Sequence, residues 1–161
     1  MIMKLKISLI FLAFLCISFV STAQSQGDVR AGAGLSFATG PFGGDGTIGF
    51  GANVEYLFKS NMSGSLEYYS YTKDSFTTNV LGIDYRYYFV TGSTQVYGNA
   101  GLSNLGGDVD GTLGINLGAG AIFPLSGNIG ISSALNYNMA KPDGANDPFG
   151  FSLKAGVMYS F

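Results

Sequence analysis

Six charged side chains lie within otherwise apolar stretches of the sequence: Arg30, Glu55, Glu67, Asp84, Arg86 and Lys154. Glu55 and Glu67 are carboxylates of the type that serve as acid and base in glycoside hydrolysis. Nothing else in the chain supports that chemistry, and the three acids balance the three bases. We interpret the six residues as a buried network of ion pairs, because an unpaired charge in a low-dielectric interior is very costly.

Missing residue types exclude much of catalytic and metal-binding chemistry. The chain has no histidine, which removes histidine general bases, serine–histidine triads and imidazole metal ligands. Its one cysteine, Cys16, lies in the N-terminal segment. We therefore expect a protein that is not an enzyme and that has no metal site and no cofactor.

Residues 1–23 have the features of a secretory signal peptide. Lys4 and Lys6 precede an uncharged apolar run, Ile7–Val20, and the sequence "STA" supplies small residues before Gln24. The run of ~14 residues is too short for a spanning helix, which needs ~20. We expect Sec-type export and cleavage, which leave residues 24–161 as a single domain without cysteine and hence without disulfides.

The composition is unusual for a water-soluble globule. The chain has 25 glycines, 10 tyrosines and 13 phenylalanines, and only 11% of its residues are charged. Soluble domains carry roughly 25% charged residues. With 8 basic against 10 acidic residues the sequence has no basic surface for a nucleic acid, so we expect no nucleic-acid partner.

Strict alternation of apolar and polar residues, broken by turn-forming clusters, predicts β-strands. Most of the alternating segments have the ~9–12 residues that a tilted strand needs to cross a bilayer. The third and fifth are short, and their bounds are the least defined. The eight segments are Val29–Ala38, Thr47–Phe58, Ser65–Tyr71, Asn79–Phe89, Val96–Ser103, Thr112–Phe123, Ile129–Met139 and Phe151–Phe161.

The polar face of these strands decides between two kinds of barrel. A soluble barrel turns its apolar face inward, whereas a membrane barrel turns it toward lipid. In the second segment the apolar face is Ile48, Phe50, Ala52, Val54, Tyr56 and Phe58. A surface facing water is normally about 25–35% charged, but the opposite face here consists mostly of Gly, Ser and Asn. The pattern predicts a transmembrane barrel with a narrow polar lumen.

Aromatic residues gather at alternate strand ends. An even number of strands places both termini on the periplasmic side, where the even-numbered strands also end. Rings prefer the membrane interface, so we predict a periplasmic girdle, and Phe37, Tyr137 and Phe151 form a thinner belt at the other side. The girdle is Tyr56, Phe58, Tyr87, Phe89, Phe123, Tyr159 and Phe161.

The signal peptide, the eight amphipathic strands and the closing "AGVMYSF" together resemble the small outer-membrane β-barrel family. This family includes the OmpA transmembrane domain, the OmpX type and the porin-like "outer membrane protein β-barrel domain". The resemblance implies an all-β, eight-stranded, antiparallel up-and-down barrel in a Gram-negative outer membrane. It also implies that the barrel-assembly machinery reads Tyr159 and Phe161. The "STAQ" sequence resembles secreted proteins of the Bacteroidota.

Three functions fit this reading. The first is a structural or surface protein, monomeric, whose lumen is plugged by the charge network and whose partners are outer-membrane lipid and lipopolysaccharide. The second is a narrow porin-like channel, because inward glycines would leave room for water: Gly32, Gly34, Gly49, Gly51, Gly82, Gly114, Gly118 and Gly120. The third is a small adhesion module acting through acidic outer loops, expected at Thr39–Gly46, Thr72–Thr78, Asn104–Gly111 and Ala140–Gly150.

Overall fold

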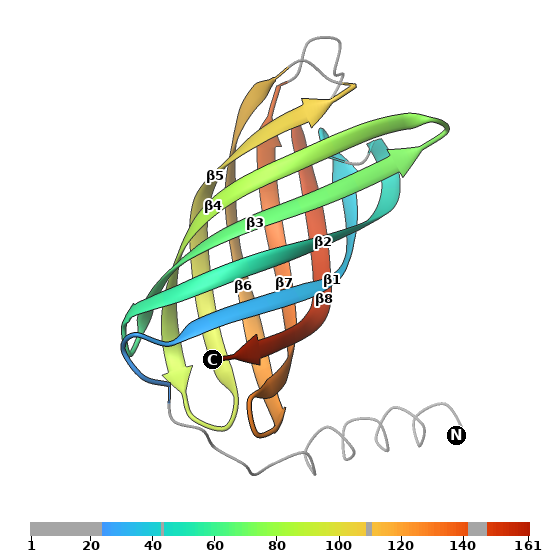
Figure 1. The fold of residues 1–161 in the computed structure, drawn as a ribbon. Coiled ribbons are helices and arrows are strands. Elements are labelled where there is room, and N and C mark those ends of the chain that lie inside the picture. The colour runs from blue at the N-terminus through green and yellow to red at the C-terminus, as the bar shows by residue number, and fades with distance from the viewer. Residues whose placement is uncertain (1–23, 43, 109–110, 142–147) are drawn as a thin grey trace, which may run out of the picture.

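The computed structural model describes residues 24–42, 44–108, 111–141 and 148–161. In these ranges eight antiparallel strands close into one barrel (Figure 1). This confirms the predicted all-β, up-and-down topology. No helix in the described ranges is both long and apolar enough to span a membrane. The predicted signal peptide, residues 1–23, lies outside the described residues. The strands are β1 (Val29–Gly40), β2 (Gly44–Lys59), β3 (Met62–Lys73), β4 (Phe76–Thr91), β5 (Gln95–Gly107), β6 (Thr112–Ser126), β7 (Ile129–Ala140) and β8 (Phe149–Ser160).

The barrel has two different ends. At one end lie the short connections 60–61, 92–94 and 127–128, together with Gln24 and Phe161, and we call it the turn end. At the other end lie the connections 41–43, 74–75, 108–111 and 141–148, and we call it the loop end. In Figure 1 the start of β1 and the end of β8 lie at the same end of the barrel. The chain therefore enters and leaves the barrel at the turn end.

Several strands are longer than the sequence pattern predicts. The third strand was expected at Ser65–Tyr71 and is Met62–Lys73, and the fifth was expected at Val96–Ser103 and is Gln95–Gly107. The loop-end connections are shorter than the four expected loops as a result. Backbone pairing continues where apolar alternation stops: Thr72 pairs with Thr77, and their hydroxyl oxygens lie 3.1 Å apart.

A two-residue turn ends the β3–β4 hairpin. Asp74 and Ser75 have φ values of 51° and 69°, which place both central residues in the left-handed region. This is the conformation of a type I′ turn, whose twist matches that of the flanking strands. The hairpin therefore keeps its pairing up to Lys73 and Phe76.

The apolar face of each strand points away from the barrel axis. Ile48 and Phe50 are 68% and 67% exposed, whereas inward-facing Glu55 is fully buried. Because backbone groups in lipid must be paired within the protein, a closed barrel satisfies them with no free edge. The outward apolar face confirms the predicted membrane-barrel orientation and excludes the soluble alternative.

The seam between β1 and β8 closes the barrel. Its register runs from Arg30 opposite Ser160 to Ala38 opposite Ser152, and the Phe161 amide donates to the Val29 carbonyl oxygen over 2.9 Å. Glycines Gly34 and Gly156 face each other in this seam. A Cβ atom on Gly34 would lie 2.3 Å from the Ala155 carbonyl oxygen. Gly34 therefore allows β1 and β8 to come closer together than a larger residue at this position would.

Candidate functional site in the barrel lumen

Glu55 is the centre of the lumen charge network. Its side chain is completely buried, and it accepts hydrogen bonds from the hydroxyls of Ser63 and Tyr88. Arg86 Nη1 lies 3.4 Å from Glu55 Oε2, and Arg30 Nη1 lies 3.8 Å from the same oxygen. Arg30 is the direct cross-strand neighbour of Glu55 in the β1–β2 register. Two cations from different strands therefore share one carboxylate.

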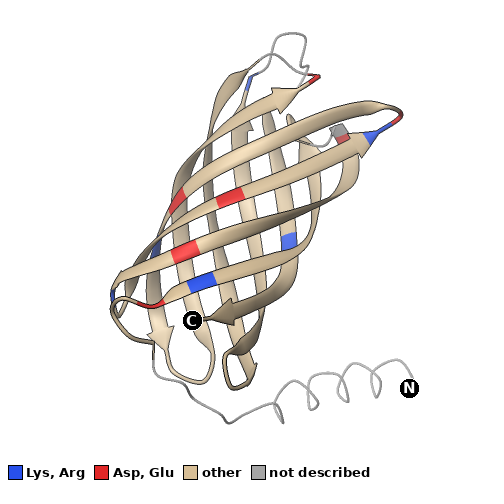
Figure 2. Cartoon of the chain, in the orientation of Figure 1, with Lys and Arg blue, Asp and Glu red and all other residues tan. Residues whose placement is uncertain are grey.

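A second carboxylate extends the network across the lumen. Glu67 Oε2 lies 3.8 Å from Arg86 Nη2, and Glu67 Oε1 accepts a hydrogen bond from Lys154. The order of contacts is Arg30, Glu55, Arg86, Glu67, Lys154, so the network joins β1, β2, β4, β3 and β8. Figure 2 shows charged positions on the middle of the barrel wall in β1 to β4, in addition to those at the strand ends. The predicted lumen residues are thus brought together, with one exception.

That exception is Asp84, which makes no ion pair within the described part of the chain. It lies in one row with Gly101 and Asn116, on β4, β5 and β6. A Cβ on Gly101 would come 1.9 Å from Asp84 Oδ1, so the glycine makes space for the carboxylate. Asn116 hydrogen-bonds Asp84, and Lys154 and Arg86 act on it electrostatically. A side-chain hydrogen bond with Glu67 connects Asp84 to the network, although Asp84 makes no ion pair with any described residue.

Tyrosine rings cover every lumen cation. Arg86 lies 4.9 Å from the ring centre of Tyr97, and Lys154 lies 4.9 Å from that of Tyr69. Arg30 lies 5.8 Å from the ring centre of Tyr88 and also donates a 3.2 Å hydrogen bond to its hydroxyl. Such contacts stabilise a cation that has left water. The alternation of apolar and polar residues in the sequence does not reveal this role of the tyrosines.

Tyrosine rings occupy the space beside two of the inward glycines. Gly49 is paired with Tyr71 and Gly51 with Tyr69 across the β2–β3 register. A Cβ on Gly49 would lie 2.5 Å from the Tyr71 ring, and one on Gly51 would lie 2.6 Å from the Tyr69 ring. The expectation that these glycines leave room for water is wrong at these positions, because tyrosines on the neighbouring strand fill the space.

An amide-rich wall faces the charges. The Asn99 amide donates to Asn136 over 2.9 Å, and the Asn138 amide donates to the Ser152 hydroxyl over 3.0 Å. These residues are all buried and come from β5, β7 and β8. The described residues contain no group of three or more His, Cys, Asp and Glu side chains able to hold a metal ion.

Apolar side chains close the lumen at the loop end. Phe42, from the β1–β2 connection, is only 4% exposed and packs with residues that face inward from five strands. Tyr71 of β3 lies over Gly49 of β2 and reaches β1, where its hydroxyl donates to the Ser36 hydroxyl over 2.8 Å. We call this group the loop-end plug. Its members are Ala38, Phe42, Tyr69, Tyr71, Val80, Leu105 and Ala140.

The predicted aromatic girdle lies at the turn end and points outward. Phe89 and Phe161 are 68% and 74% exposed. Tyr159 and Phe161 form an edge-to-face pair with ring centres 5.0 Å apart. Phe58 packs against Tyr85, with ring centres 6.0 Å apart, so Tyr85 joins the girdle although it was not predicted there. The other predicted members are Tyr56, Tyr87 and Phe123.

A second ring cluster marks the loop end. Tyr137 contacts Phe149 and Phe151, with ring centres 5.8 and 5.3 Å apart. Phe37, the third residue expected in this belt, is 47% exposed. The apolar outer surface therefore lies between two aromatic belts, as expected for a membrane barrel.

Comparison with solved structures shows which proteins share this architecture. No family model and no curated protein matches the sequence. The N-terminal β-barrel domain of Pseudomonas aeruginosa OprF superposes with a TM-score of 0.67 at 19% identity, covering 86% of this chain and 100% of that one. Neisserial surface protein A gives a TM-score of 0.63 at 20% identity, covering 83% and 96%.

The outer membrane protein OprG from Pseudomonas aeruginosa gives a TM-score of 0.61 at 13% identity, covering 86% of this chain and 98% of that one. The fold is that of the small outer-membrane β-barrels. At these identities the likeness concerns the fold alone. These structures confirm the architecture that the sequence resemblance implies.

Replacing Glu55 tests its central position. Glu55→Gln removes the charge that two buried arginines share, so we expect the free energy of unfolding to fall by about 3–5 kcal/mol. Asp84→Asn is the matched control, because Asp84 is also buried but makes no ion pair with any residue that the structure describes. The free energy of unfolding of each variant is measured by urea titration, with folded and unfolded protein separated as two bands on a gel. Equal losses for the two variants would contradict the role given to Glu55.

Proposed function

We propose that this protein is a non-enzymatic outer-membrane β-barrel of a Gram-negative bacterium, with a closed lumen and a structural or surface role. The observation that carries the proposal is the packing of apolar side chains and ion pairs inside the lumen. The loop-end plug fills one end, and the chain of ion pairs from Arg30 to Lys154 crosses the middle. A barrel filled in this way supplies a stable transmembrane body more readily than a path for solutes.

Two features of the outer surface support the membrane location. The exposed apolar band needs lipid contact, because a soluble monomer rarely exposes so large an apolar surface. The aromatic belts at both ends fit the two interfaces of a bilayer. We assign the turn end to the periplasm, since β1 begins there and β8 ends there, and the loop end to the cell exterior.

The proposed partners follow from the surface. Lipid contacts the apolar band, and lipopolysaccharide contacts the loop end through divalent cations shared with acidic side chains. Asp45 is exposed there and lies 3.9 Å from Lys73 Nζ. Asp110, Asp143 and Asp147, also expected in this acidic rim, lie outside the described residues. Tyr159 and Phe161 are proposed as the signal for the barrel-assembly machinery, and the protein is proposed to act as a monomer.

The two alternative functions fit the structure less well. A channel needs a continuous path, but tyrosine rings occupy the space beside Gly49 and Gly51, and Phe42 packs into the loop end. An adhesion module needs a large outer surface, but three of the four loop-end connections span four residues or fewer between strand ends. A structural or surface role of a barrel with a closed lumen is therefore the best-supported function.

Conductance tests whether the lumen is closed. Protein purified from membranes and inserted into planar lipid bilayers should give no steady ion current, because ion pairs and rings fill the lumen. A loop-end variant, Phe42→Ala, should also stay closed, since the ion-pair chain remains. A steady current through the unmodified protein that is lost when the lumen charges are cross-linked would overturn the proposal.

Cysteine labelling tests location and orientation. The barrel domain has no cysteine, so Ser75→Cys at the loop end and Ser93→Cys at the turn end each introduce a single exposed thiol. A membrane-impermeant maleimide added to intact cells should label position 75 and leave position 93 unlabelled. Both positions should react after the outer membrane is permeabilised, which serves as the control. Labelling of position 93 alone on intact cells would reverse the assigned orientation.

A further inference from the structure

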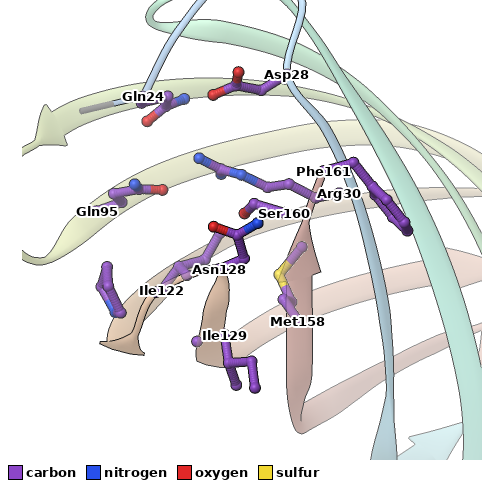
Figure 3. Close-up of a pocket in the computed structure, with 13 residues that line it drawn as sticks. Gln24, Asp28, Arg30, Gln95, Ile122, Asn128, Ile129, Met158, Ser160 and Phe161 are labelled. Carbon is purple, nitrogen blue, oxygen red and sulfur yellow. The ribbon is translucent and has the colours of Figure 1, made fainter. Parts of the chain in front are cut away.

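A cavity of about 180 Å³ opens at the turn end of the lumen. Its polar groups come from Gln24, Asp28, Arg30, Gln95, Asn128 and Ser160, and Ile122 and Met158 are among its apolar ones. The Asp28 carboxylate already accepts a 2.8 Å hydrogen bond from the Ser25 amide. In Figure 3 the Arg30 guanidinium extends toward Gln95, with Gln24 on one side and Asn128 on the other. At ~30 Å³ per molecule in the liquid, the cavity has room for about six waters, or for one small organic molecule.

Several buried polar atoms in this cavity have no hydrogen-bond partner among the described residues. They are Arg30 Nε, Gln95 Oε1 and both side-chain amide atoms of Gln24. Arg30, Gln95 and Gln24 are 4%, 3% and 8% exposed. Buried polar atoms are normally paired, and each unpaired one costs free energy. The three side chains therefore form a prepared site whose natural complement is a polar ligand.

The Arg30 guanidinium indicates the charge of that ligand. Its Nη1 atom already contacts Tyr88 and Glu55, while Nε has no partner. Glu55 is also shared with Arg86, so Arg30 has only part of one carboxylate. The edge of a guanidinium that carries Nε and Nη2 matches the two oxygens of a carboxylate.

The opposite wall of the cavity indicates the body of the ligand. Ile122 and Met158 are 4% and 3% exposed and belong to one apolar cluster with Tyr88 and Tyr97. Pro124 and Ile129 continue the apolar lining toward the opening. A ligand held by its carboxylate at Arg30 would place a short aliphatic chain against this wall.

We propose that the turn-end cavity binds a small aliphatic monocarboxylate. Arg30 holds the carboxylate, the unpaired side-chain NH2 of Gln24 donates a further hydrogen bond to it, and Ile122 and Met158 contact the aliphatic chain. Binding at this end requires no passage through the lumen, because the charge network lies between the cavity and the loop-end plug. The proposed site is therefore compatible with a closed barrel and adds a ligand-binding function to it.

Butyrate, butyramide and inorganic phosphate are suitable probes. We would follow the Arg30 Nε–H signal and the side-chain amide signals by NMR, using protein purified from membranes in detergent micelles. Butyrate should give saturable shifts with a dissociation constant of millimolar order. Neutral butyramide should bind about tenfold or more weakly, because hydrogen bonds to a charged partner are stronger. Phosphate binding as tight as that of butyrate would overturn the carboxylate assignment.

Two variants separate binding from folding. Arg30→Lys keeps the positive charge beside Glu55 but lacks the fork of two donors, so butyrate affinity should fall. Gly130→Val places an apolar side chain on the cavity lining and removes no charge, so it should also abolish binding. Gly92→Val, at a turn outside the cavity with no atom within 4 Å of its Cβ position, is the matched control and should bind normally.

A set of results would refute the site. Unsaturable shifts in the unmodified protein, or equal binding of butyrate and butyramide, would show that the cavity holds water and no specific carboxylate. Unchanged affinity in a folded Gly130→Val variant would place any binding elsewhere. These outcomes do not depend on whether the barrel conducts ions, so the closed-lumen proposal and the binding proposal fail separately.

Discussion

A charge removed from water must find its partner inside the barrel, and this constraint shapes the whole lumen. Glu55 and Glu67 are shared among three cations that come from β1, β4 and β8. Since an unpaired buried charge is costly, each contact requires its strands to hold one register. Slipping a strand by one residue would turn its charges toward lipid. The ion pairs therefore define the register across the closing seam as well as within the hairpins.

The lumen changes character from one end to the other. Apolar and aromatic side chains fill the loop end, ion pairs under tyrosine rings fill the middle, and a partly open polar cavity lies at the turn end. This gradient gives the two ends different properties. Apolar side chains pack together at the loop end, whereas the turn end has a cavity lined by buried polar atoms that have no partner within the described chain.

Much of the architecture is predictable from the sequence because it follows from alternation. The period of two assigns Ile48 outward and Glu55 inward, and low charge on the polar face distinguishes lipid from water as the outer solvent. Strand ends are harder to predict. Polar residues such as Thr72 and Thr77 continue the backbone ladder beyond the lipid, where alternation no longer marks a strand. Nothing in the apolar pattern shows how far that ladder continues.

The contacts within the lumen are less predictable, since they depend on register. The proximity of Arg30 and Glu55 can be predicted from the β1–β2 hairpin alone. The lack of an ion pair at Asp84 within the described chain cannot, because it depends on how the long side chains of Arg86 and Lys154 reach across the lumen. One usable signal was present: glycines spaced two apart at Gly49 and Gly51 oppose tyrosines spaced two apart at Tyr69 and Tyr71. Such a pair of patterns predicts rings lying over glycines.

The most direct test of the account is a double-mutant cycle on Glu67 and Lys154, which join β3 to β8 across the lumen. Glu67→Gln and Lys154→Met are made singly and together, and free energies of unfolding are measured by urea titration in detergent. We predict that the double variant is less destabilised than the sum of the single variants by about 1–3 kcal/mol. Purely additive losses would show that no ion pair couples these strands, and would contradict the account.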